Sequence, residues 1–197
     1  MQDEHFWACV RRISSILGGL AIPYHFTGGL ASSFYGEPRF TQDIDIVIRL
    51  SVDDPATNAL LERLSTGYFI DRQTIRDAIR RNSIFQALED ETGMRIDFHV
   101  GEKIPGELQR TGYKEVATGL TIPLVAKEDA ILSKLFWIQL GSGKSKRDAI
   151  QMLKNPEDLD FSRLRLQAAR LGLADELSRI EKAAASGQNA EDLDLNF

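Results

Sequence analysis

Two short motifs near the amino terminus carry the residues that could do chemistry. Gly28 and Gly29 stand side by side, and Asp43 and Asp45 follow them with a single isoleucine between the two acids. A glycine pair lets backbone N–H groups approach a phosphate closely. Two carboxylates at positions i and i+2 of an extended segment point to the same face of a sheet. A phosphate cradle beside a paired-acid metal site is what chemistry on a nucleoside triphosphate (NTP) requires.

The paired acids need a physical reason because aspartate is disfavoured in strands. Two charges about 4 Å apart in a partly shielded site repel by roughly 4 kcal/mol, and a divalent cation would offset that repulsion. Asp97 lies in a second alternating segment, so three acids converge if the two strands are neighbours. Oxygen ligands alone favour Mg2+ or Mn2+ over zinc. The alternatives are a solvated polar sheet face for Asp43 and Asp45, and an ion pair between Arg95 and a neighbouring acid for the segment of Asp97.

Apolar periodicity predicts the elements that must position these side chains. The expected helices span residues 6–17, 30–35, 55–65, 73–81, 127–140, 147–154, 161–171 and 174–185. The expected strands span residues 22–26, 43–48, 83–88 and 94–100, with one or two more within 113–125. The fold class is therefore α/β (α+β), with a mixed β-sheet core flanked by helices over residues 1–125 and a C-terminal helical segment over 126–186. Residues 187–197 read as a solvated acidic tail.

Composition restricts the classes of function. The net charge of -5 and the pI near 5.3 argue against a broad non-specific nucleic-acid surface. Cys9 is the single cysteine, so no internal disulfide can form. The acidic first residues do not resemble a secretory signal, and no apolar run is long enough to span a bilayer. We therefore expect a cytoplasmic protein without a membrane association.

Three further signals have plainer interpretations. Residues 141–145 imitate the end of a P-loop, but Ile138 stands where that motif needs glycine and a helix precedes the segment. We interpret them as a solvated charge cluster, or as a basic lip for a triphosphate or RNA. Four arginines at helical spacing within 72–81 alternate with acids, which favours a salt-bridged surface over a nucleic-acid strip. His99 shares the face of Asp97 and is interpreted as a supporting or exposed residue rather than a catalytic one.

Residues 27–31 and 36–48 together resemble the signature of the polymerase-β-type nucleotidyltransferase superfamily. That signature is a small-residue pair, a gap of about a dozen residues, and Asp-x-Asp between apolar residues. The Arg-x-Thr-x-Asp-x-Asp form at 39–45, with the later blocks 127–135 and 146–148, is most similar to the small bacterial AbiEii-like branch. Many members of that branch belong to toxin–antitoxin systems. The resemblance covers roughly residues 20–150.

The resemblance implies a role for each residue of the front motif. Gly28 and Gly29 would hold the triphosphate through backbone contacts, and Asp43 and Asp45 would bind the metal ions that bridge its phosphates. Asp97 would be the third carboxylate, which binds one metal and helps to deprotonate the acceptor hydroxyl.

The resemblance also implies supporting cations. Lys134 would contact phosphate from the helical segment, and Arg39 would neutralise phosphate charge or brace the loop. Thr27 departs from the apolar residue that usually precedes the first glycine.

Three functions are compatible with these residues. The first is a metal-dependent nucleotidyltransferase that moves a nucleoside monophosphate (NMP) from an NTP to a hydroxyl of tRNA, protein or a small molecule and releases pyrophosphate. Such an enzyme could be the toxin of a toxin–antitoxin pair, with a cognate antitoxin protein as its partner. The second is a non-catalytic module of the same fold that binds a nucleotide or a partner protein. The third is an Asp-x-Asp glycosyltransferase, which usually needs a longer chain.

Overall fold

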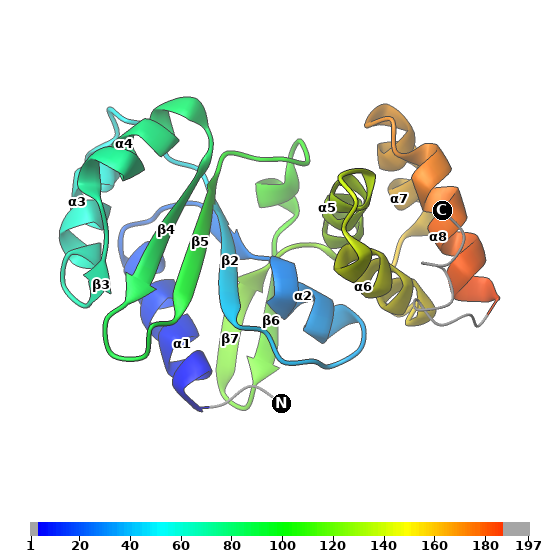
Figure 1. Ribbon diagram of the computed structural model, residues 1–197, viewed down its shortest axis with the longest axis horizontal. Coiled ribbons are helices and arrows are strands. Elements are labelled where there is room, and N and C mark those ends of the chain that lie inside the picture. The colour runs from blue at the N-terminus through cyan, green and yellow to red at the C-terminus, as the bar shows by residue number, and fades with distance from the viewer. Residues whose placement is uncertain (1–3, 187–197) are drawn as a thin grey trace. The chain divides into compact units, whose positions relative to one another are not determined.

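The computed structural model describes residues 4–186, which contain a seven-stranded mixed sheet and helices (Figure 1). The mixed α/β class predicted from the sequence is confirmed. The described residues form two units, one of residues 4–30 and 39–125 and the other of residues 31–38 and 126–186. The sequence assigns residues 31–38 to the α/β core, whereas in the structure they group with the C-terminal helices. The predicted tail at 187–197 lies outside the described residues.

The sheet of the first unit has the strand order β3-β4-β5-β2-β1-β7-β6. Strands β2 and β5 are parallel, as are β1 and β7, and the other neighbours are antiparallel. The strands are β1 (Tyr24–Phe26), β2 (Asp43–Ile48), β3 (Tyr68–Phe69), β4 (Ile84–Glu89), β5 (Arg95–Val100), β6 (Gly112–Ala117) and β7 (Leu120–Leu124). The two-residue β3 is the one strand here that the sequence did not predict, because so short a segment shows no periodicity.

One face of the sheet is buried because strands alternate apolar and polar residues. The side chains of β4 and β5 alternate between exposed or half-buried and fully buried positions, and Phe85 and Phe98 stack at a centroid distance of 4.7 Å on the buried side. Helix α4 (Arg72–Arg81) packs on β4, and α1 (Glu4–Gly19) packs against α3 (Pro55–Leu64).

Side-chain caps fix where two of these helices begin. Asp54 accepts a hydrogen bond from the Ala56 backbone N–H (2.8 Å), and Asp71 accepts one from the N–H of Thr74 (2.5 Å). Pro55 follows Asp54 at the start of α3, a position that suits proline because its missing N–H would have no partner within the helix.

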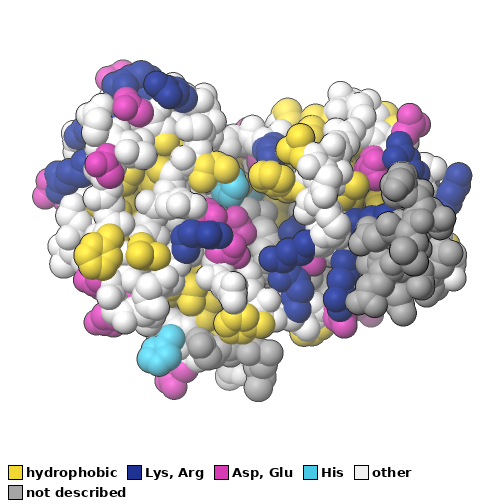
Figure 2. Space-filling model, in the orientation of Figure 1, with side chains coloured by type: hydrophobic (Ala, Val, Ile, Leu, Met, Phe, Trp, Pro, Cys, Tyr) yellow, Lys and Arg dark blue, Asp and Glu magenta, His cyan; other side chains and the backbone are white. Residues whose placement is uncertain are grey.

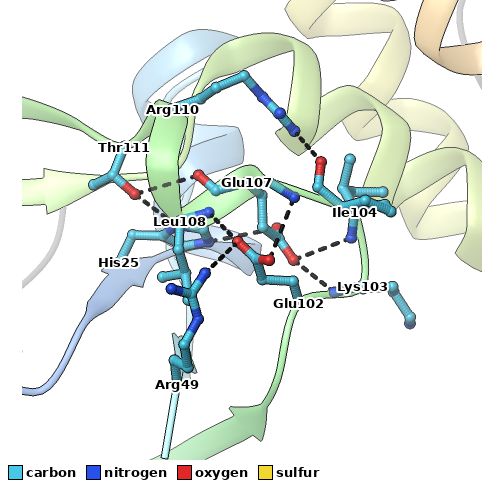
Figure 3. Close-up of polar contacts among 11 residues, drawn as sticks. His25, Arg49, Glu102, Lys103, Ile104, Glu107, Leu108, Arg110 and Thr111 are labelled. Atoms are coloured by element: carbon cyan, nitrogen blue, oxygen red, sulfur yellow. Dashed lines mark hydrogen bonds and ion pairs between the residues drawn. The ribbon is translucent and has the colours of Figure 1, made fainter.

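A buried polar cluster holds the segment after β5 against β1, the strand that leads to the glycine pair (Figure 3). The Glu107 carboxylate, at the start of the short helix η1 (Glu107–Arg110), accepts hydrogen bonds from the N–H groups of Lys103 (2.7 Å) and Ile104 (3.1 Å). His25 of β1 is fully buried, and its Nδ1 lies 3.0 Å from Thr111 Oγ1. These contacts fix β1 and therefore the position at which the chain turns into the glycine pair.

The second unit is helical. Its helices are α5 (Lys127–Gln139), α6 (Gly143–Lys154), α7 (Phe161–Arg170) and α8 (Ala174–Ala185). Helix α6 begins four residues before the predicted start, because Ser142 accepts a hydrogen bond from the Ser145 N–H (3.2 Å) and caps it. The P-loop imitation at 141–145 is therefore a helix start that follows another helix. No helix in residues 4–186 is long and apolar enough to cross a membrane.

Helix α2 (Gly28–Tyr35) also begins earlier than predicted. The sequence suggested a turn at the glycine pair and a helix from Leu30, whereas the helix already begins at Gly28. Gly28 has φ +59°, a left-handed backbone conformation that lets the chain leave β1 and enter the helix at once. The glycine pair therefore forms the first turn of a helix.

Candidate active site

Strand register brings the three predicted acids to one face of the sheet. Asp45 of β2 lies directly opposite Asp97 of β5, and Asp97 lies opposite Gln86 of β4. Two residues earlier on each strand, Asp43 lies opposite Arg95. Directly opposite residues share a face, so Asp43, Asp45 and Asp97 are grouped on the side of the sheet that the core leaves open. Figure 2 shows acidic and basic side chains gathered over β2 and β5.

The Arg95 guanidinium joins two of the acids. Its Nη2 lies 2.7 Å from Asp43 Oδ2, and its Nε lies 3.1 Å from Asp97 Oδ1. The amide Nε2 of Gln86 donates a hydrogen bond to the same Asp97 Oδ1 (3.0 Å). The pairing of Arg95 with neighbouring acids, which the sequence left as an alternative, is present together with the convergence of the acids.

Two other residues contact the paired acids of β2. The imidazole Nε2 of His99 lies 3.2 Å from Asp45 Oδ1. The hydroxyl of Thr41 donates to Asp43 Oδ1 (2.9 Å), and its side chain is buried. His99 thus supports a site carboxylate, in agreement with its interpretation as a supporting residue.

The glycine pair lies directly on the acid strand. A Cβ atom at Gly28 would stand 1.8 Å from Asp45 Oδ2, and one at Gly29 would stand 2.2 Å from Thr41 Oγ1. The Thr27 N–H donates to the Asp45 carbonyl (3.0 Å), so the chain is tied to β2 just before the helix begins. Any side chain at either glycine would displace a residue of the site. The amino-terminal end of α2, which carries partial positive charge, therefore lies beside Asp45.

The acids influence one another electrostatically. Burial raises the pKa of Asp97, and the negative charges of Asp45 and Asp43 raise it further. The Arg95 guanidinium and the Gln86 hydrogen bond act in the opposite direction without cancelling the effect. A carboxylate whose charge is disfavoured in this way gains from a nearby cation.

The donor set fits a hard divalent cation, because three carboxylates offer oxygen atoms alone. Within residues 4–186, however, no three His, Cys, Asp or Glu side chains are arranged as a metal-ligand group. In the structure Arg95 spans Asp43 and Asp97, while Asp45 lies beside His99 and Gly28. The carboxylates are in neighbouring positions, and a guanidinium supplies their positive charge.

The two other predicted site residues have local partners. Lys134 of α5 lies in the second unit, where its Nζ is 3.0 Å from Asp148 Oδ2 of α6 and both side chains are largely buried. Arg39 is half-buried, and its Nη1 donates to the Phe40 carbonyl (3.3 Å). Their roles toward phosphate stay predictions.

Sequence reasoning missed the role of two residues at this face and left the pairing of Arg95 as an alternative. Gln86 and Thr41 contact the acids, and neither belongs to the Asp-x-Asp motif itself. Thr41 and Arg95 stand two residues before Asp43 and Asp97, which was a usable signal because alternate strand positions share a face. Gln86 required knowledge of the β4–β5 register.

An exposed apolar row continues from Arg95 across the open face. Leu88 of β4 lies opposite Arg95, and Phe69 of β3 lies opposite Leu88. Phe69 is 67% exposed and Leu88 is 42% exposed. Ile84, opposite His99, is also exposed. In Figure 2 apolar side chains accordingly adjoin the charged group on the side of β4 and β3.

Comparison with known proteins agrees with this geometry. Residues 15–150 match the family model described as nucleotidyl transferase AbiEii toxin of type IV toxin–antitoxin systems. The fold is similar to that of an antigenic nucleotidyltransferase-like protein from Paracoccidioides brasiliensis, with 22% identity over 89% of this chain and 91% of the other and a TM-score of 0.54. It is also similar to the antibiotic-resistance factor ANT(2'')-Ia, with 16% identity over 93% of each chain and a TM-score of 0.51. No curated protein sequence matches significantly. Because the family model covers more than half of the sequence, the chain belongs to the AbiEii nucleotidyltransferase family and is a nucleotidyltransferase.

Proposed function

We propose that this enzyme transfers an NMP from an NTP to an acceptor hydroxyl and releases pyrophosphate, with divalent ions held by Asp43, Asp45 and Asp97. The observation that carries the proposal is the direct opposition of Asp45 and Asp97, with Gly28 seated on the Asp45 carboxylate. Acids from two strands and a helix start then surround one position on the sheet.

Each group has a task that its surroundings support. The backbone N–H groups of Gly28 and Gly29, at the positive end of α2, would bind the triphosphate. Asp43 and Asp45 would hold Mg2+ or Mn2+, which when bound supplies positive charge against the phosphates. Asp97 would accept the proton of the acceptor hydroxyl, a task suited to a carboxylate whose pKa is raised by burial.

The acceptor would approach over β4 and β3, where the exposed apolar row adjoins the acids. A surface of this kind suits an acceptor that presents an apolar or aromatic group beside its hydroxyl. tRNA, a protein side chain and a small molecule all remain candidates. The toxin description of the family supports a cognate antitoxin protein as a partner, and the cytoplasm, where NTPs are available, as the location.

The test is incubation of the protein with each α-labelled NTP, first with total cellular RNA and then with cell extract, in the presence of Mg2+ or Mn2+. We expect label in one acceptor class, and we expect Asp45→Asn and Asp97→Asn to abolish it with an unchanged circular dichroism spectrum. Asp77→Asn on α4 is the matched control, since Asp77 forms an ion pair with Arg80 away from the acids. Full transfer by Asp45→Asn would refute the assignment.

The non-catalytic alternative predicts NTP binding without incorporation for the wild-type protein. A parallel assay with UDP-sugars covers the glycosyltransferase alternative, because transfer from a UDP-sugar instead of an NTP would identify that chemistry.

A further inference from the structure

We propose that Arg95 is a built-in counter-cation of the acid cluster, which occupies Asp43 and Asp97 in the metal-free protein and must release them when a divalent ion binds. Arg95 would thereby set the metal affinity of the site. The inference rests on the proposed function, because it assumes that the three acids hold the ion.

The first support is the geometry of the two ion pairs. Arg95 uses separate nitrogen atoms, Nη2 at 2.7 Å from Asp43 and Nε at 3.1 Å from Asp97, so one guanidinium spans both carboxylates. A planar fork of donors suits such a bridge, whereas an ammonium acts as a single point charge. The oxygen atoms that Arg95 contacts are donor atoms that a metal ion would require.

The second support is the register. Arg95 lies directly opposite Asp43 and two residues before Asp97 on the same strand, so the backbone places it among the acids. Removal of Arg95 would leave Asp43 and Asp97 without their shared positive charge. The pairing thus lets the acids stay grouped before any ion arrives.

The third support is the exposure of the side chain. Arg95 is 46% exposed, whereas the Asp97 side chain is 15% exposed. A long, half-exposed side chain can change rotamer without disturbing the core, and its released guanidinium would remain near the site. Guanidinium groups bind phosphate well, so the arriving triphosphate offers Arg95 a new partner.

Asp45 has a contact of a different kind, because its Oδ1 lies 3.2 Å from the imidazole Nε2 of His99. The proposed competition between Arg95 and a divalent ion therefore concerns the oxygen atoms of Asp43 and Asp97 that the guanidinium contacts.

The test measures Mn2+ binding by electron paramagnetic resonance for the wild type, Arg95→Gln and Arg49→Gln. Arg49 is the matched control, because it is 50% exposed and forms an ion pair with Glu102 at 3.2 Å (Figure 3). We expect about threefold to tenfold tighter binding for Arg95→Gln, the size of one or two partly exposed ion pairs. Arg49→Gln should bind as the wild type does. Arg95→Lys, which keeps the charge but loses the fork, should be intermediate.

A second measurement does not depend on the affinity. In EDTA, Arg95→Gln should unfold at a lower temperature than the wild type because the carboxylates lose their counter-charge. Addition of Mn2+ should raise the unfolding temperature of Arg95→Gln by more than it raises that of the wild type. If the wild type binds Mn2+ and Arg95→Gln binds it with equal or weaker affinity, this inference is overturned and the proposed function stays intact. Failure of the wild type to bind Mn2+ any better than Asp45→Asn does would overturn the proposed function, and the inference with it.

Discussion

Substitution of Gly28 by alanine should disturb the acid strand more than it disturbs the rest of the fold. Gly28 has φ +59°, and an added Cβ would stand 1.8 Å from Asp45 Oδ2, 2.4 Å from its Cγ and 2.6 Å from its Cβ. The left-handed backbone costs an L-residue about 1–2 kcal/mol. Forcing the Asp45 side chain off its rotamer adds about 0.5–1.5 kcal/mol. Rotation about χ1 leaves the Asp45 Cβ in place, so the backbone of β2 or α2 must shift as well. The expected loss in the free energy of unfolding is therefore at least about 1.5–3.5 kcal/mol.

Gly119→Ala separates the two contributions. Gly119, in the turn between β6 and β7, has φ +70° and no neighbouring heavy atom within 4 Å of an added Cβ. It therefore carries the backbone cost alone, whereas Gly28→Ala carries the backbone cost and the contact with Asp45. We expect Gly28→Ala to be the less stable variant by at least the rotamer cost, about 0.5–1.5 kcal/mol.

The assay is urea unfolding followed by tryptophan fluorescence in a Trp137→Phe background, so that Trp7 of α1 reports on the first unit. NMP transfer is measured on the same proteins. Gly28→Ala should lose roughly 100-fold in rate, because a displacement of about 1 Å in a positioning group can have that effect. Gly119→Ala should retain its rate. Equal stabilities and equal rates in the two variants would refute the argument that Gly28 is required by its approach to Asp45.

Three further outcomes follow from the described contacts. In metal-free protein, folded Asp97 holds its proton more tightly than unfolded Asp97 does, so stability falls as the pH rises above the ordinary value of 3.8. Asp97→Asn should therefore raise the unfolding temperature in EDTA at pH 7. A lower unfolding temperature would contradict the raised pKa of Asp97. Lys134→Met should lower the free energy of unfolding, measured by thermal unfolding, by about 3–5 kcal/mol, because buried Asp148 loses its ammonium partner. If Lys134 contacts phosphate, adding Asp148→Leu should restore stability without restoring NMP transfer. Phe69→Ser or Leu88→Ser should raise the KM for the acceptor about tenfold and leave the KM for the NTP unchanged. Equal changes in both KM values would show that the acceptor does not bind at this surface.

The sequence was sufficient for the elements with a clear period or a clear cap. The alternation of isoleucine with aspartate predicted β2 at its observed bounds, and the helix predicted to start at residue 55 does start there, capped by Asp54. It failed where local chemistry overrides periodicity. The left-handed Gly28 starts α2 two residues early, and the Ser142 cap starts α6 four residues early.

The grouping of the three acids was predictable, and an ion pair of Arg95 with a neighbouring acid was among the alternatives, but which acids Arg95 contacts was not predictable. The face of each strand follows from alternation, which is why Asp43, Asp45 and Asp97 were grouped correctly. The placement of Arg95 between two of them depends on the parallel register of β2 and β5, and that register is set by long-range pairing. Periodicity within one strand carries no information about which residue of another strand lies opposite.

The contacts also separate the fixed parts of the site from the adjustable ones. Asp45 is held by main-chain bonds on both sides, since β2 pairs with β1 and β5, and the Thr27 N–H donates to its carbonyl. Gly28 closes against its side chain and leaves no room for a larger residue. The backbone of Arg95 is likewise fixed in β5, but its guanidinium lies at the end of a long, half-exposed side chain. The backbone thus fixes where the negative charges lie, while the guanidinium that balances two of them is on a side chain that can change rotamer. This combination suits the proposed function, in which a metal–nucleotide complex would bind and leave in every turnover.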